Sequence, residues 1–222
     1  MTALAQPPMH SDLGSVGWMR QFRYLSKLYE RIKGVEGDIV ECGVGQGRTF
    51  AMLCYLAGSE GSFRKVRGFD SFAGFPTPTE HDASWRNPQA GEWNFPEEMT
   101  RELVVRTGIE CSYPDLQWTL TKGFFKDTLP LEADYLVAFL HVDADLYESC
   151  RDAMRYMFTR VPRGGVVAFD DYHDIGRGAE KGEKWPGATK AIDEALEGMS
   201  LRPISYQERA ADYTFTKYFV VV

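Results

Sequence analysis

Two apolar segments of this sequence are each followed at once by acidic side chains, a pattern that suits metal binding. Asp143 and Asp145 follow the first segment, and Asp170 and Asp171 follow the second. Carboxylates that crowd together repel one another unless a cation offsets their charge, and hard divalent cations such as Mg²⁺ prefer oxygen ligands. If the two segments are neighbouring strands, Asp143, Asp170 and Asp171 converge, and we predict that they bind Mg²⁺.

Asp145 is the candidate general base in the same cluster. A divalent cation lowers the pKa of a hydroxyl that it holds, and a nearby carboxylate can then accept the proton. His141 and His173 are the alternative bases, although His141 sits in an apolar strand, where a histidine is more often a core residue. Structural roles compete as well. Asp145 and Glu148 have the spacing of a capped helix start, and Asp171 could cap a turn.

A glycine-rich turn in the first quarter of the chain has the composition of a ligand-binding loop. Gly43, Gly45 and Gly47 directly precede a helical segment, and Glu41 lies in the apolar segment before them. Glycine lets a ligand approach the backbone, and free N–H groups at a helix N-terminus attract polar ligand atoms. A dinucleotide loop needs G-x-G-x-x-G, but Arg48 stands at the third glycine. An acidic residue followed by G-x-G-x-G favours S-adenosylmethionine (SAM) instead, and the competing interpretation is a tight turn without a ligand.

Asp70 ends the next apolar segment and lies 23 residues after Gly47. This is close to the spacing at which an acidic side chain accepts hydrogen bonds from the ribose hydroxyls of a nucleotide. Asp70 followed by Ser71 also suits a helix N-terminus, so a capping role competes. The position at a strand end favours the ribose role.

The alternation of strand and helix patterns predicts a mostly parallel sheet with helices on both faces. Ligands of such sheets bind outside the carboxyl ends of the strands, where the strand order reverses. The first and fourth strands should flank that point, with the fifth beside the fourth. We predict strands at 38–42, 66–70, 116–121, 135–142, 165–170 and 214–222, and helices at 18–32, 48–57, 96–107, 146–159 and 189–196.

The bulk composition fits one globular domain. The chain has 222 residues, 44% hydrophobic and 26% charged, with a formal net charge of −7. This acidity argues against nucleic-acid binding, and the basic residues between Arg151 and Arg163 are interpreted as a solvated helix face. The four cysteines form no C-x-x-C pair, which fits reduced thiols. Without a signal-peptide pattern or an apolar stretch of membrane-spanning length, we expect a cytoplasmic protein that binds no membrane.

Several motifs, taken together, resemble the macrocin-type O-methyltransferases, a SAM-dependent family that acts on sugar hydroxyls of macrolides and aminocoumarins. The resemblance spans most of the chain from Gly37 onward. The matching stretches are GDIVECGV at 37–44, FDSFAGFP at 69–76, GFFKDTLP at 123–130, HVDADLYES at 141–149, GGVVAFDDY at 164–172 and KAIDE at 190–194.

The resemblance implies one Rossmann-like class I methyltransferase domain over residues 1–222, with a mostly parallel seven-stranded sheet. Residues 1–36 would form an N-terminal helical segment, and residues 72–108 a lid or acceptor-binding insertion. Homo-oligomers are common in the family, so a homo-oligomer is expected.

The family's site residues fall on the positions already singled out. The resemblance implies Mg²⁺ at Asp143, Asp170 and Asp171, with Asp145 as the base. The positions implied for SAM contacts are Glu41, Gly43, Gly45, Gly47, Asp70, Ser71, Gly123 and Phe124.

The acceptor is expected to be a small molecule with a hydroxyl group, but its identity does not transfer. Residues 78–95 depart from the family pattern, and Trp85 and Trp93 in this stretch could stack on a sugar or simply pack in the loop. N-methylation of an amine or amide on the same fold remains an alternative, as does a non-catalytic SAM-binding protein. A nicotinamide-dependent oxidoreductase is disfavoured because it gives the aspartates no purpose. A nucleic-acid methyltransferase is disfavoured because its usual motifs are missing.

Overall fold

Seven strands form one sheet in the computed structural model, which describes residues 15–61, 64–175, 179–209 and 214–222. The strand order is β3-β2-β1-β4-β5-β7-β6. Strands β1 to β5 run parallel, and β7 is antiparallel to both β5 and β6. The predicted mostly parallel sheet is therefore confirmed, with its reversal point between β1 and β4. The strands are β1 Asp38–Cys42, β2 Val66–Asp70, β3 Trp118–Lys122, β4 Val137–Val142, β5 Val166–Phe169, β6 Ile204–Arg209 and β7 Thr214–Val221.

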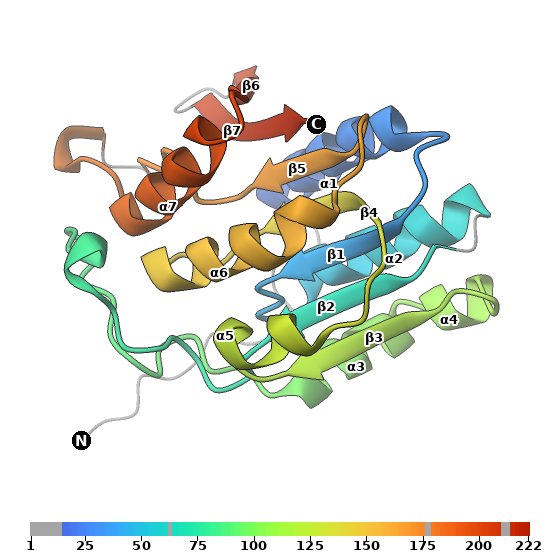
Figure 1. The fold of residues 1–222 in the computed structure, drawn as a ribbon. Coiled ribbons are helices and arrows are strands. Elements are labelled where there is room, and N and C mark those ends of the chain that lie inside the picture. The colour runs from blue at the N-terminus through green and yellow to red at the C-terminus, as the bar shows by residue number, and fades with distance from the viewer. Residues whose placement is uncertain (1–14, 62–63, 176–178, 210–213) are drawn as a thin grey trace.

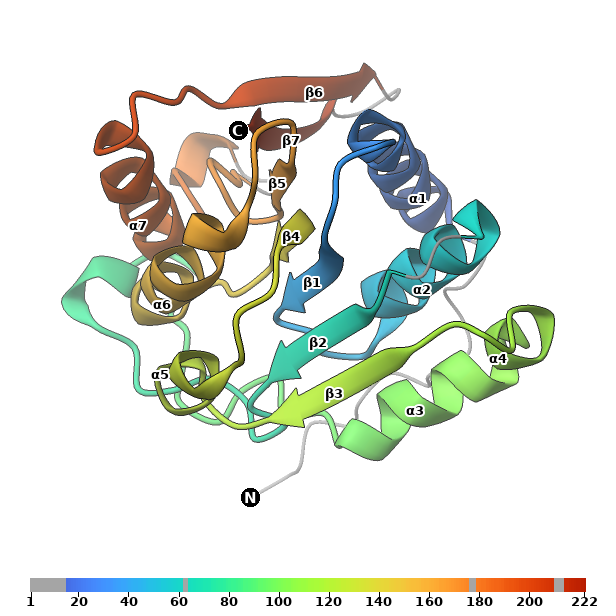
Figure 2. The ribbon, with the colours of Figure 1, turned by 45° about the vertical axis from the view of Figure 1, so that its right-hand side comes forward.

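Helices cover both faces of the sheet, as the sequence predicted (Figure 1). On one face lie α1 Val16–Tyr29, α2 Arg48–Glu60, α3 Glu97–Arg106 and α4 Ile109–Ser112. On the other lie α5 Phe125–Thr128, α6 Tyr147–Met157 and α7 Pro186–Glu197, and Figure 2 separates the two layers. Short 3-10 turns occupy Glu30–Ile32, Glu80–Asp82, Leu129–Leu131, Phe158–Arg160 and Ala179–Lys181.

Two hydrophobic clusters, one on each face, hold these layers together. Alternate residues of β4 serve the two sides: Phe139 joins the cluster under α1 and α2, and Leu140 joins the cluster under α6 and α7. All six residues of β4 are buried, as expected for a central parallel strand covered on both faces. Within the described ranges, no helix has the length and apolar character needed to cross a bilayer.

The sequence prediction missed β6, although residues 204–209 lie at the edge of the sheet. Most of its side chains are polar, and Ile204 is exposed. An edge strand of this kind lacks the apolar pattern by which the other strands were predicted. The first part of the predicted 1–36 segment, residues 1–14, lies outside the described residues, and α1 lies within the rest.

The segment between β2 and α3 lies across the carboxyl ends of the strands and is joined to α6 by Asp82. Asp82 is buried, and its Oδ1 accepts a hydrogen bond from the backbone N–H of Tyr147 at 2.7 Å. Leu146 occupies the N-cap position of α6, where no side chain of its own turn caps the helix. The interpretation of Asp145 as the cap of this helix is therefore wrong. Asp82, from the segment between β2 and α3, accepts the hydrogen bond from the start of the helix instead.

Candidate functional site

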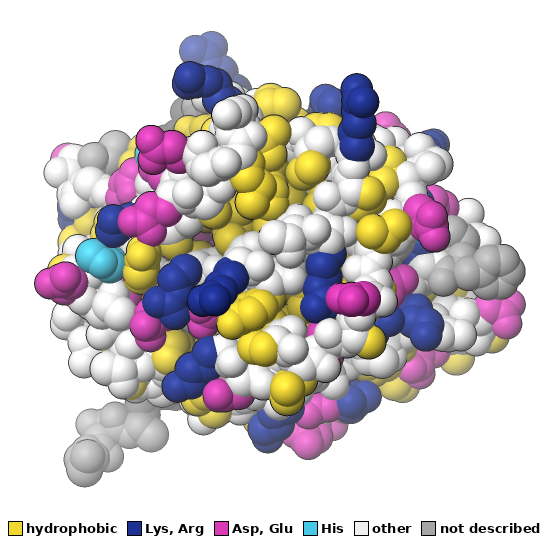
Figure 3. Space-filling model, in the orientation of Figure 1, with side chains coloured by type: hydrophobic (Ala, Val, Ile, Leu, Met, Phe, Trp, Pro, Cys, Tyr) yellow, Lys and Arg dark blue, Asp and Glu magenta, His cyan; other side chains and the backbone are white. Residues whose placement is uncertain are grey.

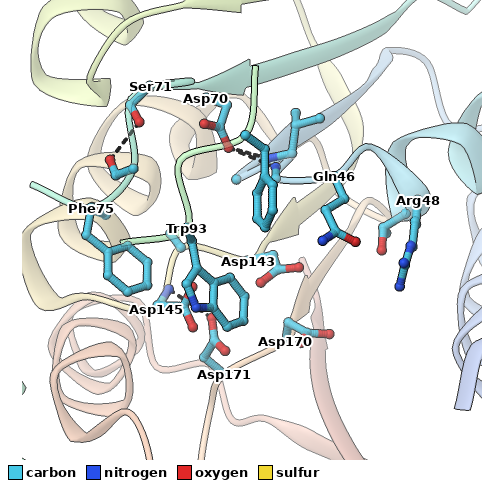
Figure 4. Close-up of a pocket in the computed structure, with 18 of the residues that line it drawn as sticks. Gln46, Arg48, Asp70, Ser71, Phe75, Trp93, Asp143, Asp145, Asp170 and Asp171 are labelled. Atoms are coloured by element: carbon cyan, nitrogen blue, oxygen red, sulfur yellow. Dashed lines mark hydrogen bonds between the residues drawn. The ribbon is translucent and has the colours of Figure 1, made fainter. Parts of the chain in front are cut away.

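A cavity of about 840 Å³ opens at the carboxyl ends of the parallel strands. Its lining combines the glycine loop, the end of β2, the segment between β2 and α3, the loops after β4 and β5, and residues of α1 and β7. Figure 4 shows the predicted aspartates gathered on one side of this space, with Asp70 and Gln46 on the other. The volume falls in the range of small-molecule sites.

At two positions of the glycine loop, Gly43 and Gly47, a side chain would collide with neighbouring atoms. Gly43 has φ +96°, and a Cβ there would lie 1.6 Å from the backbone oxygen of Asp143. Gly47 has φ +79°, and a Cβ there would lie 2.6 Å from the side chain of Thr100. Gly43 and Gly45 line the cavity, whereas Gly47 turns the chain into α2 as its N-cap. The loop is thus held close to both the acidic cluster and α3.

Asp70 holds the glycine loop in place. Its Oδ2 accepts hydrogen bonds from the N–H groups of Val44 at 2.8 Å and Gly45 at 2.9 Å, and its Oδ1 accepts one from Phe72 at 2.7 Å. No helix begins here, so the helix-capping interpretation of Asp70 is wrong. Asp70 and Ser71 both line the cavity, and Ser71 donates its hydroxyl hydrogen to the carbonyl of Gly74.

The turn after β3 contributes one of its two predicted residues to the cavity. Phe124 lines the space, and Gly123 lies behind it with φ +146°. Gly123 donates its N–H to the carbonyl of Asp70 at 2.9 Å. Gly123 therefore supports the end of β2, and Phe124 forms part of the wall.

Backbone hydrogen bonds bring the acidic residues together. Asp143 donates its N–H to Cys42, and Asp170 donates its N–H to Val142, so each strand end is fixed to its neighbour. Potential ligand atoms gather in two groups, each within 4.8 Å, that share Asp143. His141, Asp143 and Asp170 form the first group, and Asp143, Asp145 and Asp171 form the second. The three predicted Mg²⁺ ligands are thus adjacent but divided between two groups.

Asp145 has a backbone conformation that few residues other than glycine adopt. Its φ is +57°, and its N–H donates to Oδ2 of Asp171 at 2.9 Å. Aspartate tolerates the left-handed region better than most residues, and such outliers gather at functional sites. The conformation places Asp145 in the lining of the cavity.

The electrostatics of the cluster are uneven. Burial, and next the charge of Asp171, raises the pKa of Asp145 well above its ordinary value. Burial and then Asp170 raise the pKa of Asp143 well above its ordinary value, and the same two causes raise the pKa of Asp171 to about 6. Burial also opposes ionisation of Asp170, but the nearby Lys217 and His141 outweigh it and lower the pKa of Asp170.

Besides Gly47 and Gly123, three further residues predicted for the site do not line the cavity. Glu41 and His141 are fully buried and face each other across β1 and β4, with Oε1 of Glu41 2.9 Å from Nδ1 of His141. His173 is exposed on the outer side, where its Nδ1 pairs with Glu183. Glu41 and His173 are therefore not placed to contact a ligand in the cavity, whereas Nε2 of His141 lies 4.0 Å from Oδ1 of Asp170 in the cavity wall.

Sequence reasoning missed two residues that reach Asp170 from distant elements. Nζ of Lys217 on β7 lies 2.7 Å from Oδ1 of Asp170, and the side-chain amide of Gln21 on α1 donates to the same atom at 3.1 Å. Lys217 is the one charged residue of β7, and this isolated charge is the sequence feature that could have marked it as a functional candidate. Gln21 shares the apolar face of α1 with Leu25 and Leu28.

An aromatic group stands over the acidic side of the cavity. The rings of Phe75 and Trp93 stack with centroids 6.0 Å apart, and both meet Trp185 edge to face. Nζ of Lys184 lies 4.9 Å from the centre of the Trp185 ring. Phe75, Trp93 and Lys184 line the cavity, while Trp85 is exposed and donates to the carbonyl of Gly182. Of the two tryptophans singled out from the sequence, Trp93 is the one at the site.

The basic residues after Leu146 form no separate site. Figure 3 shows Lys and Arg side chains over α6 mixed with Asp and Glu. Arg151 pairs with Glu148 and Asp152, and Arg160 donates to the carbonyl of Ala133. These local contacts agree with a solvated helix face.

The sheet order, the glycine loop after β1 and the acidic ends of β2, β4 and β5 define a Rossmann-like class I methyltransferase fold. The chain belongs to the macrocin-O-methyltransferase (TylF) family, whose sequence profile matches residues 10–202. The resemblance inferred from the sequence motifs is thereby confirmed.

Curated relatives and solved structures agree with this assignment. The chain is 36% identical over 145 residues to the 8-demethyl-8-(2,3-dimethoxy-α-L-rhamnosyl)-tetracenomycin-C 4′-O-methyltransferase of Streptomyces olivaceus, an alignment that covers 63% of this chain and 54% of the relative. It is 31% identical over 147 residues to the mycinamicin III 3″-O-methyltransferase of Micromonospora griseorubida, covering 63% of this chain and 56% of the relative. The match thus spans about half the length of these relatives.

Among solved structures, the calicheamicin methyltransferase CalS11 superposes with a TM-score of 0.75 at 22% identity, covering 93% of this chain and 80% of that one. The O-methyltransferase NovP superposes with a TM-score of 0.68 at 25% identity, covering 91% and 79%. At 22% identity, the superposition on CalS11 shows a shared fold.

Proposed function

We propose that this protein transfers a methyl group from SAM to a hydroxyl of a small-molecule acceptor, assisted by Mg²⁺ and a carboxylate base. The observation that carries the proposal is the acidic cluster of Asp143, Asp145, Asp170 and Asp171, which faces the glycine-loop cavity in a member of this family. The curated relatives are named as O-methyltransferases, two of them for rhamnosyl-tetracenomycin and mycinamicin substrates.

The glycine-loop side of the cavity suits SAM. Gly43 and Gly45 expose backbone to the cavity without a Cβ, so that a ligand can approach closely. Oδ1 of Asp70 accepts one backbone bond and retains a lone pair, so the carboxylate can still accept from a ribose hydroxyl. Phe124 offers an apolar surface to the adenine. When bound, SAM would supply a methyl group on a cationic sulfur.

The acidic side suits a divalent cation. Burial, and next the negative charge of Asp170, raises the pKa values of Asp143 and Asp171. Oxygen donors are those that Mg²⁺ prefers, and a bound dication would return these carboxyls to their ionised state. Asp143, Asp170 and Asp171 would hold the ion, which would make the acceptor hydroxyl more acidic.

Asp145 is placed to accept the acceptor's proton. It lines the cavity beside the proposed ligands and is positioned by its N–H bond to Asp171. Asp145 would accept the hydroxyl proton as the acceptor oxygen takes the methyl group from bound SAM. Burial raises the pKa of Asp145, but Lys184 acts in the opposite direction. The positive charge of Lys184 thus favours the ionised base. Phe75 and Trp93 would form an apolar wall on which a sugar ring can stack.

The first experiment is a calorimetric titration with S-adenosylhomocysteine, with and without Mg²⁺. We expect micromolar or tighter binding, about 8 kcal/mol. Turnover of labelled SAM with a panel of glycosides would follow, with amine analogues of the same acceptors as the comparison. Failure of the folded protein to bind S-adenosylhomocysteine would refute the proposal. Methylation of the amines in preference to the hydroxyls would replace O-methylation with N-methylation.

A further inference from the structure

His141 lies against the acidic cluster with one ring nitrogen unpaired. Its side chain is fully buried, and Nε2 has no hydrogen-bond partner among the described residues. Nε2 lies 4.0 Å from Oδ1 of Asp170, and ligand atoms of His141, Asp143 and Asp170 lie within 4.8 Å of one another. A buried polar atom without a partner costs about 1–3 kcal/mol, so its retention points to a role.

The other ring nitrogen is held by Glu41. Nδ1 of His141 lies 2.9 Å from Oε1 of Glu41, and both side chains are excluded from solvent. Histidines that bind metals almost always donate their second N–H to a carboxylate, a carbonyl or water, which fixes the tautomer and the ring orientation. With Nδ1 donating to Glu41, the lone pair of Nε2 is directed at the acidic cluster.

We infer that His141 binds the divalent cation through Nε2, together with Asp143 and Asp170. The inference rests on the proposed function only in requiring a cation in the cluster. It gives Glu41 the role of a positioning residue that orients His141, which accounts for an acidic side chain that is buried behind the cavity. It also assigns His141 a role other than general base.

A neutral nitrogen ligand suits the charge of this group. Asp143 adds negative charge to a cluster in which carboxyl groups already raise one another's pKa values. Asp170 is partly neutralised by Lys217, so it offers the cation less net charge. Imidazole supplies a donor without further repulsion. Imidazole also suits transition metals such as Fe²⁺, Ni²⁺ and Zn²⁺ better than it suits Mg²⁺.

The test uses Mn²⁺ as the probe on the full chain with S-adenosylhomocysteine bound. Pulsed electron paramagnetic resonance detects nitrogen nuclei bonded to Mn²⁺, and protein grown with ¹⁵N-histidine separates histidine from every other nitrogen. We expect a ¹⁴N imidazole signal that becomes a ¹⁵N signal on labelling. The signal should vanish in His141→Gln, with at least about tenfold weaker Mn²⁺ binding. His173→Gln, an exposed histidine at the same edge of the sheet, should retain both.

The outcomes separate this inference from the proposed function. Saturable Mn²⁺ binding without a histidine ¹⁵N signal would overturn ligation by His141 and leave metal-assisted methyl transfer intact. No saturable Mn²⁺ binding would overturn both. The labelled wild-type protein gives the decisive measurement, so the test does not depend on whether His141→Gln folds.

Discussion

The two sides of the acidic cluster differ in what balances their charge. Asp170 is paired with Lys217 and accepts from Gln21, and its pKa is lowered. Asp145 and Asp171 have each other as partners, and within the described residues no basic side chain forms an ion pair with either. Burial and mutual repulsion raise both of their pKa values.

This difference shows which carboxylates of the cluster have their charge balanced by the protein itself. On the Asp170 side, the carboxylate is held in its ionised form by contacts from α1 and β7. The Asp145–Asp171 side carries negative charge that a proton or a cation must offset, because buried carboxylates at this separation cannot all ionise freely. A bound cation would therefore compete with protonation more at Asp145 and Asp171 than at Asp170.

The largest effect is expected from Asp143→Asn, which alters the carboxylate shared by both ligand groups. Activity should fall about a thousandfold or more, since the site loses a ligand. The melting temperature of the metal-free protein should rise, because a source of buried repulsion is removed. Single-turnover assays and melting curves in a chelator measure the two changes, with Asp134→Asn at an exposed position as the control. Undiminished metal-dependent turnover would refute the shared-ligand role.

Asp145→Asn should lower the rate of the chemical step by about a hundredfold and leave the affinity for S-adenosylhomocysteine unchanged. The amide cannot accept the proton but preserves the size of the side chain. Rapid-quench kinetics give the rate, and calorimetry gives the affinity. A rate equal to that of the wild type would limit Asp145 to a structural role beside Asp171.

Lys217→Gln removes the cation that balances the charge of Asp170. The ammonium group competes with a dication for Asp170, so its removal should strengthen Mn²⁺ binding by about tenfold. The same change should destabilise the metal-free protein by about 1–3 kcal/mol, because the partly buried Asp170 loses a charged partner. Metal titrations and melting curves with and without Mn²⁺ give both values. Unchanged metal affinity would show that Lys217 does not compete.

The smallest effect is a dependence of stability on pH. Asp171 has a pKa of about 6 in the folded protein, against about 3.9 in an unfolded chain. Between these values the folded state binds more protons, so the metal-free protein should lose stability as pH rises from about 4 to about 6. Saturating Mg²⁺ should flatten this slope. Melting temperatures across this range provide the measurement, and stability rising with pH in the chelated protein would contradict the assignment.

The sequence was sufficient for features that depend on local pattern. The strand alternation, the glycine loop and the acidic strand ends were predicted because each follows from neighbouring residues and from the rule that parallel strands end at one edge. Gly43 and Asp143 were placed at the same site in this way.

The remaining features depend on contacts between distant parts of the chain. Gln21 reaches Asp170 across 149 positions, and Asp82 reaches Tyr147 across 65. No local pattern marks such pairs. The burial of Glu41 against His141 depends on strand register, which the motif alone did not reveal.

The contacts of Asp82 bear on how acceptor preference could be re-engineered. Asp82 accepts from Thr79 and Tyr147, and a Cβ on Gly187 would come within 2.0 Å of it. Replacing the whole segment between β2 and α3 with that of a relative would remove this anchor and loosen the start of α6, whose N-cap Leu146 follows Asp145. Loop libraries should therefore keep Thr79, Asp82 and Gly187 constant and vary only the stretch that carries Trp93.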